Sequence, residues 1–171
     1  MKTALICNGP SQDQYVDLDY DYVMGCNITE HPVDATVIID RNVILYWAAM
    51  RESITTPCLF SVEAWRFADE IKFRKYILEH GKFLGLLPKP PEFYNAGHQA
   101  AETLIRNGAT SIDIYGCDSY FEDTVESSTN KYVNDHNASS EKQRIKHWRI
   151  NWERILLTHS DVTINFIRKP E

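Results

Sequence analysis

Short apolar runs alternate with amphipathic segments along most of this 171-residue chain. The runs are rich in β-branched and aromatic residues, which is typical of buried strands. They occupy Thr3–Cys7, Tyr22–Cys26, Ala35–Asp40, Pro57–Phe60, Ser111–Tyr115 and Val162–Ile167. Segments with apolar residues at helical spacing lie between several of them, at Asn42–Met50, Val62–Glu79, Gly97–Arg106 and Glu141–Leu157. Because strands that alternate with helices form parallel sheets, we predict an α/β fold, a Rossmann-like three-layer sandwich with a mainly parallel sheet.

The length of the chain suits a single Rossmann-like domain over residues 1–171, since a chain of about 150 residues buries most of its unfolded surface. No internal repeat interrupts it. The stretch Gly81–Phe93 carries two Gly and three Pro and is the one candidate linker. We expect it to be a loop that separates two halves of the domain.

The composition argues against nucleic-acid and membrane partners. Lys and Arg number 18 and Asp and Glu number 24, a formal net charge of −6, whereas binding to a phosphate backbone needs clustered basic side chains. No apolar run approaches the roughly 20 residues that cross a bilayer, and the run at Thr3–Cys7 is too short for the core of a signal peptide. The four cysteines (Cys7, Cys26, Cys58 and Cys117) are widely spaced beside apolar residues. We therefore expect a cytoplasmic protein with buried, reduced thiols.

Polar turns follow four of the expected strands. They are Asn8-Gly9-Pro10-Ser11, Gly25-Cys26-Asn27, Asp40-Arg41 and Gly116-Cys117-Asp118-Ser119-Tyr120. In a parallel sheet these turns meet at the edge where open α/β sheets bind ligands. Amides, hydroxyls and carboxylates there offer hydrogen bonds, and glycine lets a ligand approach the backbone. The alternative is that these residues only form turns.

A fifth group, Asn95-Ala96-Gly97-His98, lies at the start of an expected helix. The backbone N–H groups of a helix start attract anions such as phosphate, and Gly97 permits close approach. His98 is a candidate for an added proton or hydrogen bond. The alternative is that Asn95 is only an N-cap.

Other charged residues are candidates for catalysis, metal binding or ligand steering. His136 lies in a polar loop, where catalytic groups often occur, and Asp40 and Asp118 are a possible acid and base pair. The basic run on the last helix is expected to be a solvated face or to steer an anionic ligand; it contains Lys142, Arg144, Lys146 and Arg149. The acidic cluster Glu122, Asp123 and Glu126 is more typical of a solvated loop than of a divalent-ion site. Neither a P-loop nor a GxGxxG motif is present, and no metal or cofactor is expected.

Together these motifs resemble the nucleotide-binding core of bacterial sialyltransferases and of related sialyltransferase-like domains, many of them short phage proteins. The resemblance rests on the four motifs that contain Asn8-Gly9-Pro10-Ser11, Gly25-Cys26-Asn27, Asn95-Ala96-Gly97-His98 and Gly116–Tyr120, and it extends to the last helix and strand. It implies a Rossmann-like fold that holds a cytidine nucleotide-sugar without an obligatory metal.

The resemblance also implies residue roles. Asn8, with Gly9 and Ser11 of the same turn, and Asn27 would contact phosphate and ribose. The helix start with Asn95, Gly97 and His98 would meet the phosphate. Asp118 and Tyr120 would lie beside the sugar. His136 is the nearest candidate for the catalytic base by position, and His147 on the last helix is the alternative.

The sequence is compatible with three functions. The first is a glycosyltransferase-like enzyme that transfers or hydrolyses a CMP-sugar. The second is a non-catalytic nucleotide-binding or interaction protein on the same fold, which the small size and Ala96 in place of the family's hydroxyl favour. The third is another nucleotide-dependent transferase of the pterin pyrophosphokinase type, which would need ATP and a divalent ion.

Overall fold

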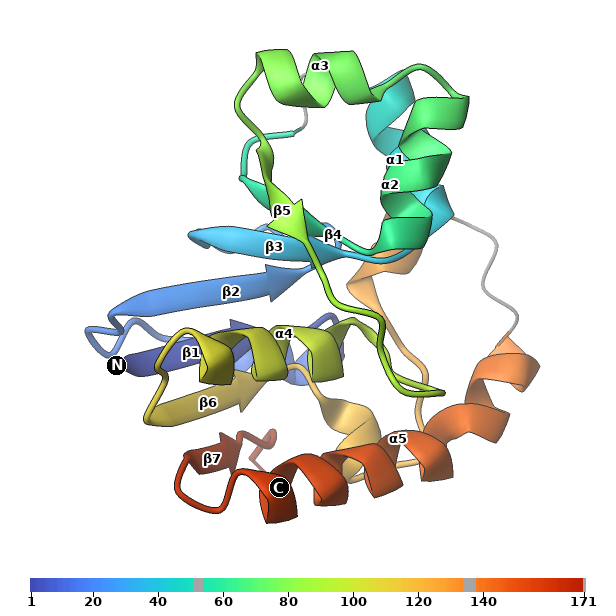
Figure 1. Ribbon diagram of the computed structural model, residues 1–171. Coiled ribbons are helices and arrows are strands. Elements are labelled where there is room, and N and C mark those ends of the chain that lie inside the picture. The colour runs from blue at the N-terminus through green and yellow to red at the C-terminus, as the bar shows by residue number, and fades with distance from the viewer. Residues whose placement is uncertain (51–53, 134–137, 171) are drawn as a thin grey trace.

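The computed structural model describes residues 1–50, 54–133 and 138–170 (Figure 1). Its strands are β1 (Lys2–Ile6), β2 (Tyr22–Cys26), β3 (Ala35–Ile38), β4 (Cys58–Phe60), β5 (Phe83–Leu86), β6 (Ser111–Tyr115) and β7 (Thr163–Phe166). Its α-helices are α1 (Arg41–Ala49), α2 (Val62–Glu70), α3 (Arg74–Glu79), α4 (Ala96–Arg106) and α5 (Ala138–Thr158). Short 3₁₀ helices occupy η1 (Pro10–Gln14), η3 (Asp118–Tyr120) and η4 (Ser128–Lys131).

The strands form one seven-stranded sheet in the order β5-β4-β3-β2-β1-β6-β7, and every neighbouring pair is parallel. The predicted Rossmann-like α/β fold is therefore confirmed. The chain builds the sheet from β1 outward to β5 and then returns through α4 to place β6 on the other side of β1. This reversal between β1 and β6 is the position at which open α/β sheets bind their ligands.

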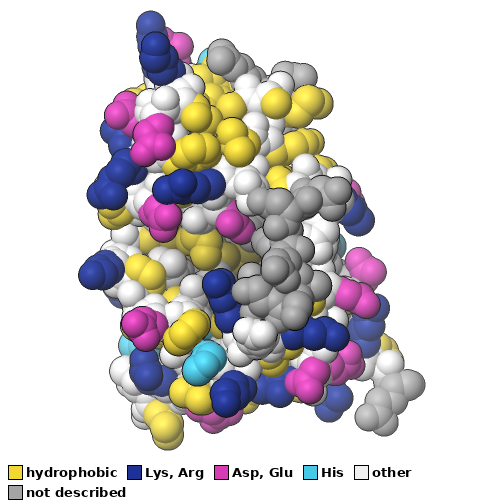
Figure 2. Space-filling view, turned by 90° about the vertical axis from the view of Figure 1, so that its right-hand side faces the viewer, with side chains coloured by type: hydrophobic (Ala, Val, Ile, Leu, Met, Phe, Trp, Pro, Cys, Tyr) yellow, Lys and Arg dark blue, Asp and Glu magenta, His cyan; other side chains and the backbone are white. Residues whose placement is uncertain are grey.

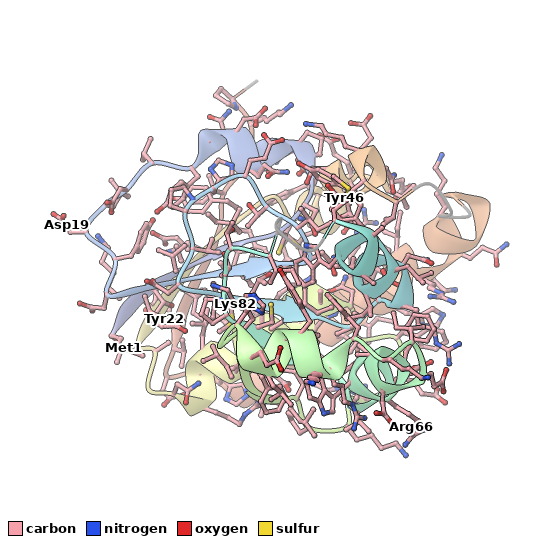
Figure 3. The ribbon with its side chains drawn as sticks, turned by 90° about the horizontal axis from the view of Figure 1, so that it is seen from above. Met1, Asp19, Tyr22, Tyr46, Arg66 and Lys82 are labelled. Carbon is pink, nitrogen blue, oxygen red and sulfur yellow. The ribbon has the colours of Figure 1, made fainter. Side chains whose placement is uncertain are left out.

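Helices cover the two faces of the sheet in different places. Because side chains alternate along a strand, Val37 of β3 packs under α4 whereas Ile38 packs under α1 and α2. The core beneath α4 and α5 also contains Leu5, Ile112 and Trp152. In Figure 1, α4 and α5 lie beside β1, β6 and β7, while α1, α2 and α3 gather at the β4–β5 end. Figure 3 shows Met1 and Tyr22 on one side of the molecule and Tyr46 and Arg66 on the opposite side.

An irregular segment covers the remaining face of β1, β2 and β6. Tyr15 and Tyr20 pack there against Ala4, Ile6 and Tyr115. The hydroxyl of Tyr20 donates to Asp113 Oδ2 at 2.7 Å and lies 2.6 Å from the hydroxyl of Tyr115. Burial and these two hydrogen bonds raise the pKa of Tyr20, so its hydroxyl stays protonated at neutral pH.

Two sequence predictions are wrong in this part of the chain. The expected linker Gly81–Phe93 contains the edge strand β5, whose residues pair with β4 from Cys58 to Phe60. The expected helix Val62–Glu79 is two helices, because the chain turns sharply at Lys72, where φ is +59°. Apolar periodicity continues across the turn, so it does not reveal the break.

The break between α2 and α3 is a Schellman motif. The N–H of Phe73 donates to the carbonyl of Ala68 at 2.8 Å, and the N–H of Lys72 donates to the backbone carbonyl of Asp69 at 3.0 Å. Phe73 is 1% exposed, which ties the turn to the core. Lys72 itself is exposed and occupies the left-handed position that glycine usually takes.

No described helix combines the length and the apolar composition that crossing a membrane requires. All four cysteines are buried and none is in a disulfide, as the sequence predicts.

The left-handed backbone at Lys72 makes a stability prediction. Lys72→Gly should raise the free energy of unfolding by up to about 1 kcal/mol, because removal of the Cβ strain exceeds the entropy that glycine loses. For a chain of this size, the melting temperature should rise by about 2–4 °C. Lys72→Ala removes the same charge but keeps the strain, so calorimetry should show little change for it. An equal rise in both variants would contradict the strain argument.

Candidate functional site

The carboxyl ends of the central strands open into a pocket of about 460 Å³. Its walls come from the ends of β1, β2, β3 and β6, the segment before α4, residues 124–127, 129 and 130, and Arg144 and Trp148 of α5. Figure 2 views this side of the molecule, where charged side chains of both signs surround apolar ones. Asn8, Asn27, Gly97 and Asp118 all line the pocket, so the predicted convergence of these distant residues is present in the structure.

Asn8 joins three segments of the pocket floor. Its Nδ2 donates to the carbonyls of Cys26 at 3.0 Å and Ile28 at 3.3 Å, and its Oδ1 accepts from Asn27 Nδ2 at 3.1 Å. Its backbone carbonyl accepts from the N–H of Ser128 at 2.8 Å. Both atoms of the Asn8 amide are therefore used inside the protein, which makes this residue a brace for the pocket.

Asn27 and Thr129 retain unused hydrogen-bonding atoms. Asn27 has a left-handed backbone with φ of +54°, which asparagine tolerates better than most residues. Asn27 Oδ1 and Thr129 Oγ1 are buried and lack a hydrogen-bond partner among the described residues. Both residues line the pocket, and a buried polar atom without a partner carries an energetic cost that a ligand can remove.

The turns after β1 and β6 are joined through Asp118. Asp118 Oδ2 accepts from both the backbone N–H and the Oγ of Ser11, each at 2.9 Å, and Ser11 Oγ accepts from the N–H of Gly116 at 3.0 Å. A Cβ on Gly9 would lie 2.3 Å from Asp118 Oδ2 and 2.6 Å from the Gly116 carbonyl. Gly9 is therefore required by close packing, and Ser11, at 1% exposure, does not line the pocket.

The start of α4 contains a reciprocal cap. Asn95 Oδ1 accepts from the N–H of His98 at 3.1 Å, and His98 Nδ1 accepts from the N–H of Asn95 at 3.0 Å. Since Nδ1 is an acceptor, Nε2 carries the proton and donates to the carbonyl of Trp148 at 2.9 Å. His98 is fully buried and both ring nitrogens are occupied, so it has no nitrogen left for a nucleotide. Burial lowers the pKa of His98 to about 4.

Gly97 lies beside this cap with little free space. A Cβ there would lie 3.2 Å from Cys7 Sγ and 3.3 Å from the ring of Trp152. The structure shows acceptors for the N–H groups of His98 and Gln99, and within its described residues it shows none for those of Ala96 and Gly97. These two residues line the pocket, so the first turn of α4 presents backbone donors to it.

Tyr120 is placed outside the pocket. Its ring stacks on Phe166 with centroids 4.0 Å apart, and its hydroxyl donates to Glu153 at 3.0 Å. Burial raises the pKa of Tyr120, and the hydrogen bond to Glu153 adds to the shift. In this structure Tyr120 fastens η3 to α5 and β7, and it does not reach the space that the sequence prediction assigns to it.

The charged lining of the pocket is mixed. Asp40 and Glu126 line it together with Arg144, whereas Asp123 pairs with Arg149 at 3.0 Å on the outside. No group of three or more His, Cys, Asp or Glu side chains in the described ranges is arranged to hold a metal ion. His136, the candidate catalytic base, lies outside the described residues.

Three thiols form part of the floor, from Cys7, Cys26 and Cys117. A hydrogen bond with Cys117 lowers the pKa of Cys7, but a hydrogen bond with Cys26 and burial together raise it well above its ordinary value. The hydrogen bond with Cys7 and burial likewise raise the pKa of Cys117. The thiols of Cys7 and Cys117 are therefore uncharged at neutral pH.

Sequence reasoning missed the aromatic residues of the pocket. Phe93 ends the stretch expected to be a linker and Tyr94 follows it directly, while Trp148 belongs to the last helix, where apolar residues at helical spacing are also typical of core. The signal available in the sequence was their position beside Asn95-Ala96-Gly97, the motif already assigned to the helix start. Arg144 was considered only as part of a solvated or steering face.

The buried cap makes a pH prediction. An unfolded histidine has a pKa of about 6.5, so protonation favours the unfolded chain between that value and the folded pKa of about 4. His98 contributes about 3 kcal/mol to the free energy of unfolding. This contribution is complete above pH 6.5 and is lost as the pH falls towards 4. Gln at this position can keep the cap but does not titrate. Denaturant unfolding between pH 7 and 4 should show a steeper loss for the wild type than for His98→Gln; equal slopes would refute a buried neutral His98.

Comparisons of this chain with protein-family models, curated proteins and solved structures find no match. The resemblance to bacterial sialyltransferases therefore stays a prediction from the motifs.

Proposed function

We propose that this protein binds a nucleotide or nucleotide-sugar in the pocket at the carboxyl edge of its sheet. The observation that carries the proposal is the N-terminus of α4, an 11-residue helix whose first turn opens into the pocket at Ala96 and Gly97. Backbone donors and the helix dipole favour a phosphate at such a position. The pocket volume of about 460 Å³ lies within the range of small-ligand sites.

Arg144 supplies positive charge to the same pocket. The chain as a whole carries a formal charge of −6, so an anionic ligand needs a local cation to offset the repulsion. Arg144 lines the pocket from α5. It is far along the chain from the α4 motif, but both border the same pocket. A guanidinium matches the geometry of phosphate oxygens in two parallel hydrogen bonds.

The remaining polar lining suits the hydroxyl groups of a ribose. Asn27 Oδ1 is a buried acceptor without a partner among the described residues, and Thr129 Oγ1 is a buried hydroxyl in the same state. The carboxylates of Asp40 and Glu126 add further acceptors. A ribonucleotide offers hydroxyl donors to these oxygens and phosphate oxygens to α4 and Arg144.

Binding is favoured over catalysis because two of the three proposed catalytic residues have other contacts. Asp118 Oδ2 accepts from Ser11 at 2.9 Å, and the hydroxyl of Tyr120 is bonded to Glu153. Sugar transfer from a CMP-sugar is the second candidate, and Glu126 favours it, since a pocket carboxylate can take the proton of an acceptor hydroxyl while CMP leaves.

The charge argument predicts that Arg144→Gln weakens nucleotide binding. Loss of one charge-assisted hydrogen bond costs about 1.5–3 kcal/mol, so the dissociation constant for cytidine 5′-monophosphate should rise at least ten-fold in calorimetric titration. Lys146 is an exposed cation two residues away that does not line the pocket. Lys146→Gln is therefore the matched control and should leave binding unchanged. Equal losses in both variants would show general steering instead of a site.

The second candidate predicts turnover. Incubation with CMP-sialic acid should release CMP, and Glu126→Gln or His136→Ala should slow the release by about 10²–10⁴-fold if either residue is the base. Chromatography of the nucleotide products measures this directly. Binding of CMP-sialic acid without any release of CMP would support nucleotide binding and reject sugar transfer.

A further inference from the structure

The segment before α4 is fixed at both ends. The Nδ2 of Asn151, a residue that is 4% exposed, donates to the carbonyl of Glu92 at 3.1 Å, and Asn95 caps the helix three residues later. Tyr94 is also held, because its hydroxyl donates to Glu102 at 2.6 Å. The backbone of Phe93 is therefore placed by its neighbours on both sides.

Phe93 has two features that cost free energy. Its φ is +61°, a left-handed conformation that is a real outlier for a bulky residue. Its side chain belongs to the large apolar groups that remain exposed, at 45%, although it lines the pocket. Strained residues persist where the surrounding structure holds them, and they cluster at ligand sites.

The ring of Phe93 is oriented by His147. The two rings are nearly parallel, with centroids 4.3 Å apart and an interplanar angle of 13°. His147 thus covers one face of the phenyl ring, and the exposed part of the ring borders the pocket. A flat apolar surface in a fixed orientation at a pocket is suited to a flat aromatic ligand group.

We propose that Phe93 is the stacking platform for the nucleobase of the bound nucleotide, an inference that rests on the proposed function. Only two residues lie between Phe93 and Ala96, so their Cα atoms are within about 11 Å of each other. That length matches a nucleotide whose phosphate is at α4 and whose base is at Phe93. Phosphate and base thus bind to two neighbouring parts of one short segment.

The chemistry of stacking defines the ligand class. Every nucleobase has a π face, so an aromatic platform adds affinity without choosing among bases. It does, however, separate nucleotides from sugar phosphates, which carry the same phosphate and ribose but no base. The platform therefore makes the pocket selective for nucleotides as a class.

The test compares cytidine 5′-monophosphate with ribose 5-phosphate on three proteins: wild type, Phe93→Asn and Phe93→Tyr. Asn tolerates the left-handed backbone, so Phe93→Asn removes the ring without adding strain. Calorimetric titration should show about a ten-fold rise in the dissociation constant of Phe93→Asn for cytidine 5′-monophosphate and no change for ribose 5-phosphate. Phe93→Tyr keeps a ring and should bind both ligands as the wild type does.

The outcomes separate this inference from the proposed function. If the wild type binds neither ligand, the proposed function and the platform are both rejected. If the wild type binds cytidine 5′-monophosphate and Phe93→Asn binds it equally well, the nucleotide site stands and the platform is rejected. Equal weakening of both ligands in Phe93→Asn would show that the residue only shapes the segment, which also overturns the platform.

Discussion

The contact between Asp118 and Ser11 is the interaction on which the pocket depends. One carboxylate oxygen accepts two hydrogen bonds at 2.9 Å and so ties the turn after β1 to the turn after β6. These two strands are neighbours in the sheet although 105 residues separate Ser11 from Gly116, whose N–H completes the network. The order in which strands are added to the sheet reverses at this pair, so the contact holds together the two halves of the sheet where the pocket opens.

This constraint changes how the motifs should be interpreted. Asn8, Asp118 and His98 are three of the residues that the motifs assign to a ligand, yet both amide atoms of Asn8, Oδ2 of Asp118 and both ring nitrogens of His98 bond to the protein. These three residues fix the turns that form the walls of the pocket. The atoms left for a ligand are the N–H groups of Ala96 and Gly97, at the helix start that the motifs also indicate, and the side-chain oxygens of Asn27 and Thr129.

The sequence predicted the sheet well because buried parallel strands have a strong local signature. Tyr22–Cys26 and Ser111–Tyr115 are predicted to the residue, and the parallel arrangement brings the strand-end turns to one edge. Edge strand β5 was missed because half of its residues face solvent and prolines follow it closely. The direction of a side chain could not be predicted. No feature of the neighbouring sequence indicates that Tyr120 turns to Glu153 or that His98 turns to Trp148.

If the pocket binds a nucleotide as we propose, the distribution of charge in the pocket sets its orientation. The thiols of Cys7 and Cys117 are neutral. A hydrogen bond with Cys26 and burial raise the pKa of Cys7, and a hydrogen bond with Cys7 and burial raise that of Cys117. The carboxylates of Asp40 and Glu126 repel a phosphate, whereas Arg144 and the α4 N-terminus attract it. A nucleotide bound with its phosphate at α4 places its hydroxyl groups towards the acceptors, and the opposite orientation would bury like charges against each other.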